Sequence, residues 1–233
     1  MADINQILEL LRSFPFLADQ PEDLLVQLAG DAQLLRFSLG QAISRADQPQ
    51  AQLFFLLQGT ARSVVMAQRL ARGVATLQRL GPGAVFGWTA LSCGTNRETL
   101  IASTDLVALA LPHAALAGAM ARHPSLAQRV QTSVNPAELF ALLDAHLRDY
   151  PRALAKEVVQ AATALADSCR AASLEPGQLA TTQFPPERLW LVAGGGLPLG
   201  TVLPTALPVA DPRPLRVIGI DRDGLARHLD PPS

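Results

Sequence analysis

A glycine-rich turn set between two apolar segments is the feature that most constrains the fold of this 233-residue chain. Residues 80–103 read LGPGAVFGWTALSCGTNRETLIAS, with a strand-like pattern at each end. Gly83 and Gly87 allow sharp backbone turns at points where a side chain would clash. Residues 88–91 are long enough for one helical turn. The stretch therefore predicts a strand, a tight turn, a single helical turn and a second strand.

The same stretch contains a candidate phosphate site. A helical turn that begins at Trp88 presents free backbone N–H groups at its start, where phosphates bind readily. Arg97 can supply a forked, permanently charged donor to the same phosphate. Short patterns of glycine and arginine also recur by chance, so the alternative is that Arg97 is a scattered arginine beside ordinary turns.

The segments around this stretch follow a definite order. An apolar run that ends in glycine, LFFLLQG at 53–59, precedes a hairpin-like stretch, and PGAVFG at 82–87, Arg97 and LVALAL at 106–111 follow. This order resembles the cyclic-nucleotide-binding domain, the β-roll of catabolite-type regulators, kinase regulatory subunits and nucleotide-gated channels. The resemblance covers roughly residues 7–130 and rests on several ordered positions. It implies a jelly-roll with helical flanks.

The resemblance also implies where a ligand binds. The arginine that binds the cyclic phosphate in the family corresponds to Arg97, and Thr99 takes the place of a small residue, usually alanine. The family's glutamate, which holds the ribose 2′-hydroxyl, is replaced by Trp88, which cannot accept that hydrogen bond. The expected ligand contacts are Gly87, Trp88, Thr89, Ala90, Arg97 and Thr99.

The replacement at Trp88 makes a cyclic-AMP site doubtful on chemical grounds. We expect cyclic AMP to bind weakly or not at all, with an empty pocket slightly favoured, and we expect no other cofactor. The indole of Trp88 either fills the sugar site or stacks on a base, and the sequence does not choose between these. The identity of any phosphate-bearing ligand stays open.

Composition excludes several other classes of protein. Hydrophobic residues make up 49% and charged residues 17%, which is typical of a globular chain. The net charge of −1 argues against nucleic acid as the main partner, since that would require a concentrated basic face. The two cysteines have no partner motif and fit a reducing, cytoplasmic compartment. The four histidines lack metal-ligand spacing and no catalytic motif stands out, so we expect neither a metal site nor an enzyme.

One uncharged run, residues 189–210, is long enough to cross a bilayer. It contains three consecutive glycines and three prolines, which break a helix. The run therefore predicts strands and turns, and we expect no membrane span in this chain.

Two helices are predicted at 136–147 and 152–166, and Asn135 caps the first ahead of Pro136. Their expected exposed face mixes charges of both signs, on Glu138, Asp144, Arg148, Asp149, Lys156 and Glu157. Mixed charge repels the DNA backbone about as often as it attracts it, so we do not expect this pair to read DNA.

The C-terminal part repeats features of the first part in the same order. LEPGQLA at 174–180 echoes SLGQAI, LWLVAG at 189–194 echoes LFFLLQG, LGTV at 199–202 echoes FGWT, and 215–225 echoes 106–116. The hairpin between the second and third features is missing. The order predicts an abbreviated second β-roll, with shared turn chemistry by chance as the alternative. No residue there is placed as Arg97 is, Arg213 being nearest, so this copy is expected to bind no nucleotide.

The predicted fold is mainly β with helical flanks, in the α+β class. We expect a cyclic-nucleotide-binding-like domain at 1–133, a helical pair with an abbreviated second β-roll at 134–230, and the start of a linker at 231–233. The expected function is that of a non-catalytic cytoplasmic regulatory or sensor module. The chain also looks like the N-terminal region of some cyanobacterial ABC exporters with peptidase domains. The alternatives are a docking domain for an export substrate or protein partner, and a transcription regulator without its own DNA-binding domain.

Overall fold

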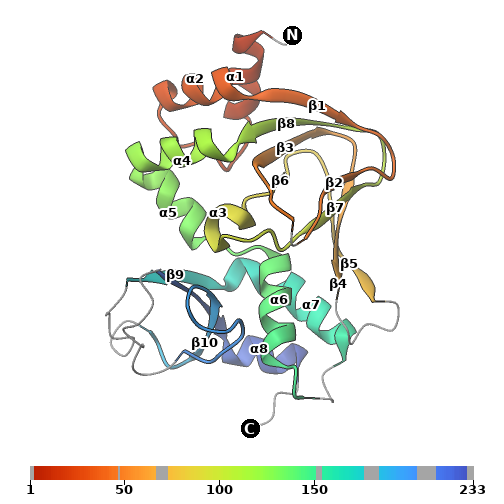
Figure 1. Cartoon of the computed structure of the whole chain (residues 1–233), viewed down its shortest axis with the longest axis vertical. Helices are drawn as coiled ribbons and strands as arrows, with labels where there is room; N and C mark the ends of the chain where they lie inside the picture. The colour runs from red at the N-terminus through yellow and green to blue at the C-terminus, as the bar shows by residue number, and fades with distance from the viewer. Residues whose placement is uncertain are drawn as a thin grey trace. The chain divides into compact units, whose positions relative to one another are not determined.

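The computed structural model describes residues 3–46, 48–66, 73–150, 154–175, 184–203 and 214–229. The chain divides into two compact units, whose elements are labelled in Figure 1. The first unit consists of Met1–Ser63 and Gln78–Val130, and the second of Val64–Leu77 and Gln131–Ser233. Compact units need not coincide with sequence repeats, so the predicted domain boundary after residue 133 stays a prediction. No helix among the described residues is long and apolar enough to cross a membrane.

Strands β1 to β8 form two four-stranded sheets, of order β1-β8-β3-β6 and β2-β7-β4-β5. The boundary between the units falls within β4 and β5. Strand β8 pairs antiparallel with β1 and β3, β3 with β6, and β2 with β7. The strand bounds are Gln33–Phe37 (β1), Ala42–Ser44 (β2), Gln52–Gln58 (β3), Ala61–Met66 (β4), Val74–Leu80 (β5), Val85–Phe86 (β6), Thr99–Ala102 (β7) and Leu106–Pro112 (β8). This β-rich architecture with helices agrees with the predicted jelly-roll.

Strands β3 and β8 are buried on both faces. Successive side chains of a strand point to opposite sides, so Phe54 and Ala110 face a core shared by the two sheets, while Phe55 and Leu109 face a second core. Burial on both faces explains why residues 53–57 read as a continuous apolar run without alternation.

Helices of the first unit close the second core. They are α1 (Ile4–Arg12), α2 (Glu22–Asp31), α4 (His113–Arg122) and α5 (Pro124–Thr132), and Figure 1 shows α1 and α2 next to the β1 and β8 end of the sheet. Their apolar residues, such as Leu11, Leu28 and Leu116, are fully buried against the sheet. The rings of Phe14 and Phe55 meet edge to face with centroids 4.8 Å apart.

Besides the parts of β4 and β5 within Val64–Leu77, the second unit combines helices with one three-stranded antiparallel sheet of order β10-β11-β9. Its elements are α6 (Pro136–His146), α7 (Ala155–Leu165), a 3₁₀ turn at Ala166–Ser168, β9 (Arg170–Leu174), β10 (Arg188–Gly194), β11 (Leu215–Asp221) and α8 (Arg222–His228). The predicted cap of α6 is confirmed, because the Asn135 side chain accepts a hydrogen bond from the N–H of Ala137 at 2.7 Å and Pro136 opens the helix.

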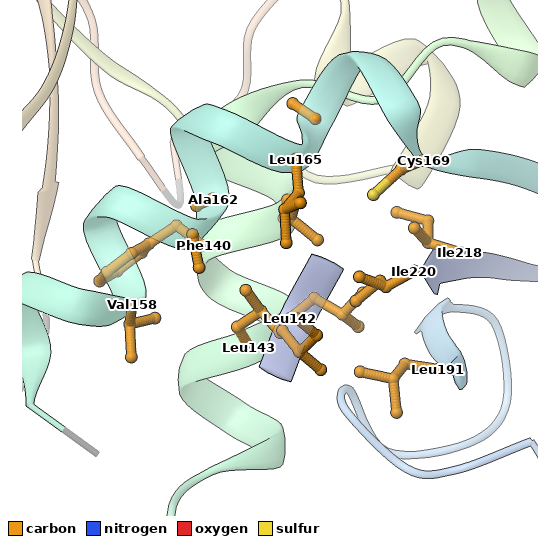
Figure 2. Packing of buried hydrophobic residues seen from close by; sticks show 14 of the residues in the cluster. Phe140, Leu142, Leu143, Val158, Ala162, Leu165, Cys169, Leu191, Ile218 and Ile220 are labelled. Atoms are coloured by element: carbon orange, nitrogen blue, oxygen red, sulfur yellow. The ribbon is translucent and has the colours of Figure 1, made fainter. Parts of the chain in front are cut away.

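The core of the second unit lies between its helices and one face of its sheet. Figure 2 shows Leu142 and Leu143 of α6 together with Leu165 of α7, pointing toward Ile218 and Ile220 of β11. These side chains are buried, and they account for the apolar stripes that predicted the two helices.

One member of the expected exposed face is buried. Glu138 is 1% exposed and forms a two-pronged ion pair with Arg216 of β11, at 2.6 Å to Nε and 3.0 Å to Nη2. Arg216 also donates to the carbonyl oxygens of Gln131 and Ser133. The prediction that Glu138 faces solvent is therefore wrong, because a cation supplied by a distant strand compensates its burial.

The sheet of the second unit resembles part of the first sheet in its strand order and pairing. Strand β8 lies between β1 and β3, and β11 lies between β9 and β10. The β1–β8 and β9–β11 ladders are antiparallel and each contains five residue pairs, which include Phe37 with Leu106 in the first and Leu174 with Leu215 in the second. Helix α4 directly follows β8, and α8 directly follows β11.

The remaining ladder repeats an irregularity as well. The β3–β8 ladder shifts register at the residue before Gly59. The β10–β11 ladder shifts register at the residue before Gly195. A Cβ on Gly59 would lie 2.8 Å from the Cα of Leu106, and one on Gly195 would lie 3.0 Å from the Cα of Leu215. The backbones approach too closely at both places for a side chain to fit.

The predicted second β-roll is nevertheless not confirmed. The part of the second unit that begins at Gln131 has one sheet and an isolated bridge between Leu191 and Val202, and its described residues form no further sheet. Gly177, Arg213, the hairpin residues 67–72 and the linker 231–233 lie outside the described residues. The predictions for these positions stay predictions.

Candidate ligand site in the first unit

The turn at Gly87 is held from two sides. Its φ of +88° lies in the region that favours glycine, and a Cβ there would lie 2.6 Å from the carbonyl oxygen of Gln52. The ring Nε2 of His113, the first residue of α4, lies 2.9 Å from the Gly87 carbonyl oxygen. Because a carbonyl only accepts, Nε2 carries the proton in this bond. Close packing and this hydrogen bond together position the backbone that enters the predicted helical turn.

The helical turn itself is α3, Thr89–Cys93, and Trp88 occupies its N-cap position. The N–H of Leu91 already donates to the Trp88 carbonyl at 3.0 Å. Within the described part of the chain, the N–H groups of Trp88, Thr89 and Ala90 make no hydrogen bond. The predicted row of free donors is therefore present at three of its four residues.

The side chain of Trp88 lies in the hydrophobic core of the first unit. Its side chain is only 7% exposed and belongs to the core that the sheet shares with α1, α2, α4 and α5, together with Leu53 and Phe55. Phe86, two residues earlier, lies in the core between the sheets. The indole is therefore a core residue on the helical side, and it supplies no acceptor for a ribose hydroxyl.

Thr89 connects the glycine turn to Arg97. Thr89 is fully buried. Its hydroxyl oxygen accepts a hydrogen bond from the Arg97 N–H at 3.4 Å, and its hydroxyl donates to Asn96 Oδ1 at 3.4 Å. The side-chain amide of Asn96 donates to the Arg45 carbonyl at 2.6 Å. In the described part of the chain, the partly buried guanidinium of Arg97 makes no ion pair or hydrogen bond. The structure thus anchors the Arg97 backbone and leaves its charge available.

Thr99 has a structural role in the described residues. Its hydroxyl oxygen accepts a hydrogen bond from the N–H of Ala46 at 2.9 Å. This bond leaves the hydroxyl proton available to an acceptor. Thr99 is thus tied to the β2–β3 connection.

The sequence analysis missed Glu98, which lies between the two predicted ligand residues Arg97 and Thr99. Its side chain is completely buried. Its N–H donates to Asn96 Oδ1 at 3.1 Å, and its carbonyl accepts from the Ser44 hydroxyl at 3.0 Å. The alternation of buried residues through 98, 100 and 102 was the sequence signal that could have placed it inside the β-roll.

The described residues were also compared with the expectation that the chain holds no metal site. No group of three or more His, Cys, Asp or Glu side chains there could hold a metal ion. Burial in the core of the second unit raises the pKa of the Cys169 thiol to about 12, although the nearby charge of Arg188 opposes the shift. Burial lowers the pKa of His113 below its ordinary value of 6.5, and hydrogen bonds with the backbone of Gly87, Gln50 and Gln52 oppose this shift.

A family comparison identifies part of the chain. Residues 34–123 match the family model of the cyclic nucleotide-binding domain. The family predicted from the order of motifs is therefore supported for the first unit. No curated protein matches the chain.

Several solved structures match about half of this chain. The regulatory subunit of a cAMP-independent protein kinase A from Trypanosoma brucei is 20% identical, with a TM-score of 0.48 over 54% of this chain and 46% of that one. A putative cyclic nucleotide-binding protein from Geobacter metallireducens is 20% identical, with a TM-score of 0.46 over 56% and 90%. The N-terminal domain of a Streptomyces coelicolor transcriptional regulator is 21% identical, with a TM-score of 0.43 over 52% and 84%. The match spans less than half of the trypanosomal kinase subunits, 46% of one and 43% of another.

Proposed function

We propose that the chain is a non-catalytic regulatory module and that the first unit holds a phosphate-bearing ligand at Gly87–Ala90, Arg97 and Thr99. The observation that carries this proposal is the state of Arg97. Its backbone is anchored by Thr89, and its partly buried guanidinium has no partner within the described residues. A guanidinium whose backbone is tied to a helical turn with free N–H groups is suited to a phosphate oxygen.

Cyclic AMP is a poor candidate for this ligand. The position that follows Gly87 carries an indole packed in the hydrophobic core, so no carboxylate is available there for the ribose. A hydrogen bond to a charged group contributes about 1.5–3 kcal/mol, and its loss weakens a ligand by roughly ten- to a hundredfold. We therefore propose that cyclic AMP binds weakly or not at all.

Calorimetry of the purified chain with cyclic AMP, cyclic GMP and cyclic dinucleotides tests the site. For any ligand that binds, Arg97→Ala should weaken binding by roughly ten- to a hundredfold, because it removes the charge-assisted contact. Arg62→Ala, which removes an exposed arginine from β4, is the matched control and should leave the affinity unchanged. Micromolar binding of cyclic AMP that survives Arg97→Ala would place the ligand elsewhere and contradict the proposal.

We also propose that the second unit descends from a second copy of the β-roll, reduced to one of its two sheets. The supporting observations are the matching ladders, the register shifts before Gly59 and Gly195, and the helix that follows the central strand in each unit. The missing hairpin in the sequence repeat is consistent with loss of the other sheet.

An experimental structure of the chain tests this descent. The expected result is that Leu174 pairs with Leu215 and Val192 with Val217, because a slip of one residue would turn every side chain of the strand to the opposite face. A register different from that of the first unit at these pairs would contradict the duplication.

The wider setting of the module rests on resemblance alone. The expected attachment to an ABC exporter, the cytoplasmic location, the docking role and the role in transcription all stay predictions. Transmembrane segments and a phosphate-binding loop encoded after Ser233 would support the exporter, whereas a helix-turn-helix would support a transcription regulator.

A further inference from the structure

We infer that the second unit binds a small, uncharged apolar molecule that carries a hydroxyl or N–H group, in a cavity beside His146. This site is separate from the one proposed at Arg97, and the inference does not rest on the proposed function. The ligand class follows from the size of the cavity, from its leucine walls and from the ring nitrogen that His146 leaves available.

The cavity borders the hydrophobic core of the second unit. Its volume is about 420 Å³, within the range of about 300–1,000 Å³ that is typical of small-molecule sites. The described residues that line it all belong to the second unit. Five leucines form much of its wall, and all but the third are buried: Leu143, Leu147, Leu189, Leu225 and Leu229. The apolar body of a ligand would therefore leave water for contact with these side chains.

His146, the last residue of α6, lines the cavity and supplies the polar group that selects the ligand. Its Nδ1 lies 3.0 Å from the Gly200 carbonyl oxygen. Because a carbonyl only accepts, Nδ1 carries the proton in this bond, and in a neutral imidazole Nε2 is then an acceptor. Within the described part of the chain, Nε2 has no hydrogen bond. It therefore fits a ligand that donates a hydroxyl or N–H hydrogen.

The fold holds the His146 ring in this state. A Cβ on Gly200 would lie 2.6 Å from the backbone nitrogen of His146, so the two backbones are closely packed. Gly200 is in turn tied to β10, because its N–H donates to the Val192 carbonyl at 2.9 Å. The partner of Nδ1 is thus fixed in place, and with it the choice of Nε2 as the acceptor.

The charges at the cavity favour an uncharged ligand. Arg222 and Asp223 of α8 both line it, and both are exposed. The Nε of Arg222 donates to the Pro186 carbonyl at 3.2 Å. Adjacent charges of opposite sign leave little net charge to attract an ion, so neither an acid nor a base is selected. Tyr150, which is 40% exposed, adds an aromatic surface to the lining.

Calorimetry of the full chain with 2-naphthol at about pH 8, where histidine side chains are generally neutral, tests the site. The naphthalene ring is apolar and the hydroxyl donates. 2-Methoxynaphthalene, which has the same ring system and no hydrogen to donate, is the matched probe. The unmodified chain should bind 2-naphthol at least about threefold more tightly than the ether, because the ether cannot donate to Nε2. His146→Phe keeps a ring without the acceptor and should bind the two probes about equally.

A second variant locates the ligand. Ala226 is an exposed residue of α8 that lines the cavity, so Ala226→Trp introduces an indole there without replacing a buried side chain. It should weaken the binding of 2-naphthol at least about tenfold, because the indole occupies the ligand's space. Ala164→Trp, the same change at an exposed position of α7 away from the lining, is the matched control and should leave the affinity unchanged.

Four results would overturn the inference. The first is the absence of saturable binding of 2-naphthol, and the second is equal affinity of the unmodified chain for both probes. The third is an affinity that Ala226→Trp does not change, which would put the ligand elsewhere. The fourth is a preference for 2-naphthol that persists in His146→Phe. If His146→Phe does not fold, as judged by circular dichroism, the first three results decide. None of these results bears on the site proposed at Arg97.

Discussion

At the residue scale, two side chains near the turn at Gly87, those of Trp88 and Arg97, have different roles. Gly87 allows the chain to turn where a Cβ would collide with the Gln52 carbonyl, and Trp88 then enters the core under the helices. The Arg97 N–H donates to the hydroxyl oxygen of Thr89, and this bond holds the Arg97 backbone near the same turn. Sequence could name these residues as neighbours through the family pattern. It could not place the indole, because the side of the sheet that Trp88 enters depends on the backbone rotation at Gly87.

His113 should make the stability of the chain depend on pH. Its pKa in the folded state is below the ordinary value of 6.5, so below that value the unfolded chain binds a proton that the folded chain resists. The free energy of unfolding should therefore fall as the pH falls from 6.5 toward the folded pKa. The advantage of the unmodified chain over His113→Gln should shrink over the same range.

Urea unfolding between pH 5 and pH 7.5 measures this dependence. His123→Gln, which removes another histidine from the first unit, is the control and should keep the slope of the unmodified chain. A constant difference in unfolding free energy between His113→Gln and the unmodified chain across this pH range would show that His113 does not contribute the dependence.

At the element scale, helices and buried strands could be predicted and their long-range partners could not. The stripe of leucines in α6 and its cap at Asn135 are local signals, and both are confirmed. The apolar run that forms β3 could be predicted from the sequence because it too is a local signal. The partner of Glu138 is 78 residues away on β11, and nothing local identifies it. A charged residue on a helix was therefore assigned to solvent when it belongs to the core.

The ion pair between Arg216 and Glu138 should be essential to the second unit. Arg216→Met leaves a buried carboxylate and two carbonyl oxygens without their donor, which should lower the free energy of unfolding by about 3–5 kcal/mol. Arg170→Met, on the exposed side of neighbouring β9, is the matched control and should change it by less than about 0.5 kcal/mol. Denaturant unfolding gives both values. A loss below about 1 kcal/mol for Arg216→Met would show that the pair is dispensable.

At the scale of the whole molecule, the order of motifs predicted more than the composition did. The order of glycines and apolar runs led to the family that residues 34–123 match. The same reasoning proposed a second β-roll, for which the described residues contain one sheet with the corresponding ladders. Sequence could not show how many strands of the predicted second β-roll form, because a missing hairpin does not reveal which strands pair.

The central claim is that the site at Arg97 lacks the partner for a ribose hydroxyl. The most direct test compares the binding of cyclic AMP and 2′-deoxy cyclic AMP to the purified chain by calorimetry. If Trp88 has removed that partner, cyclic AMP should bind no more than about threefold more tightly than its deoxy analogue, or neither should bind. A hydroxyl held by a charged group would instead contribute about 1.5–3 kcal/mol. Micromolar binding of cyclic AMP that weakens tenfold or more on removal of the 2′-hydroxyl would contradict the account.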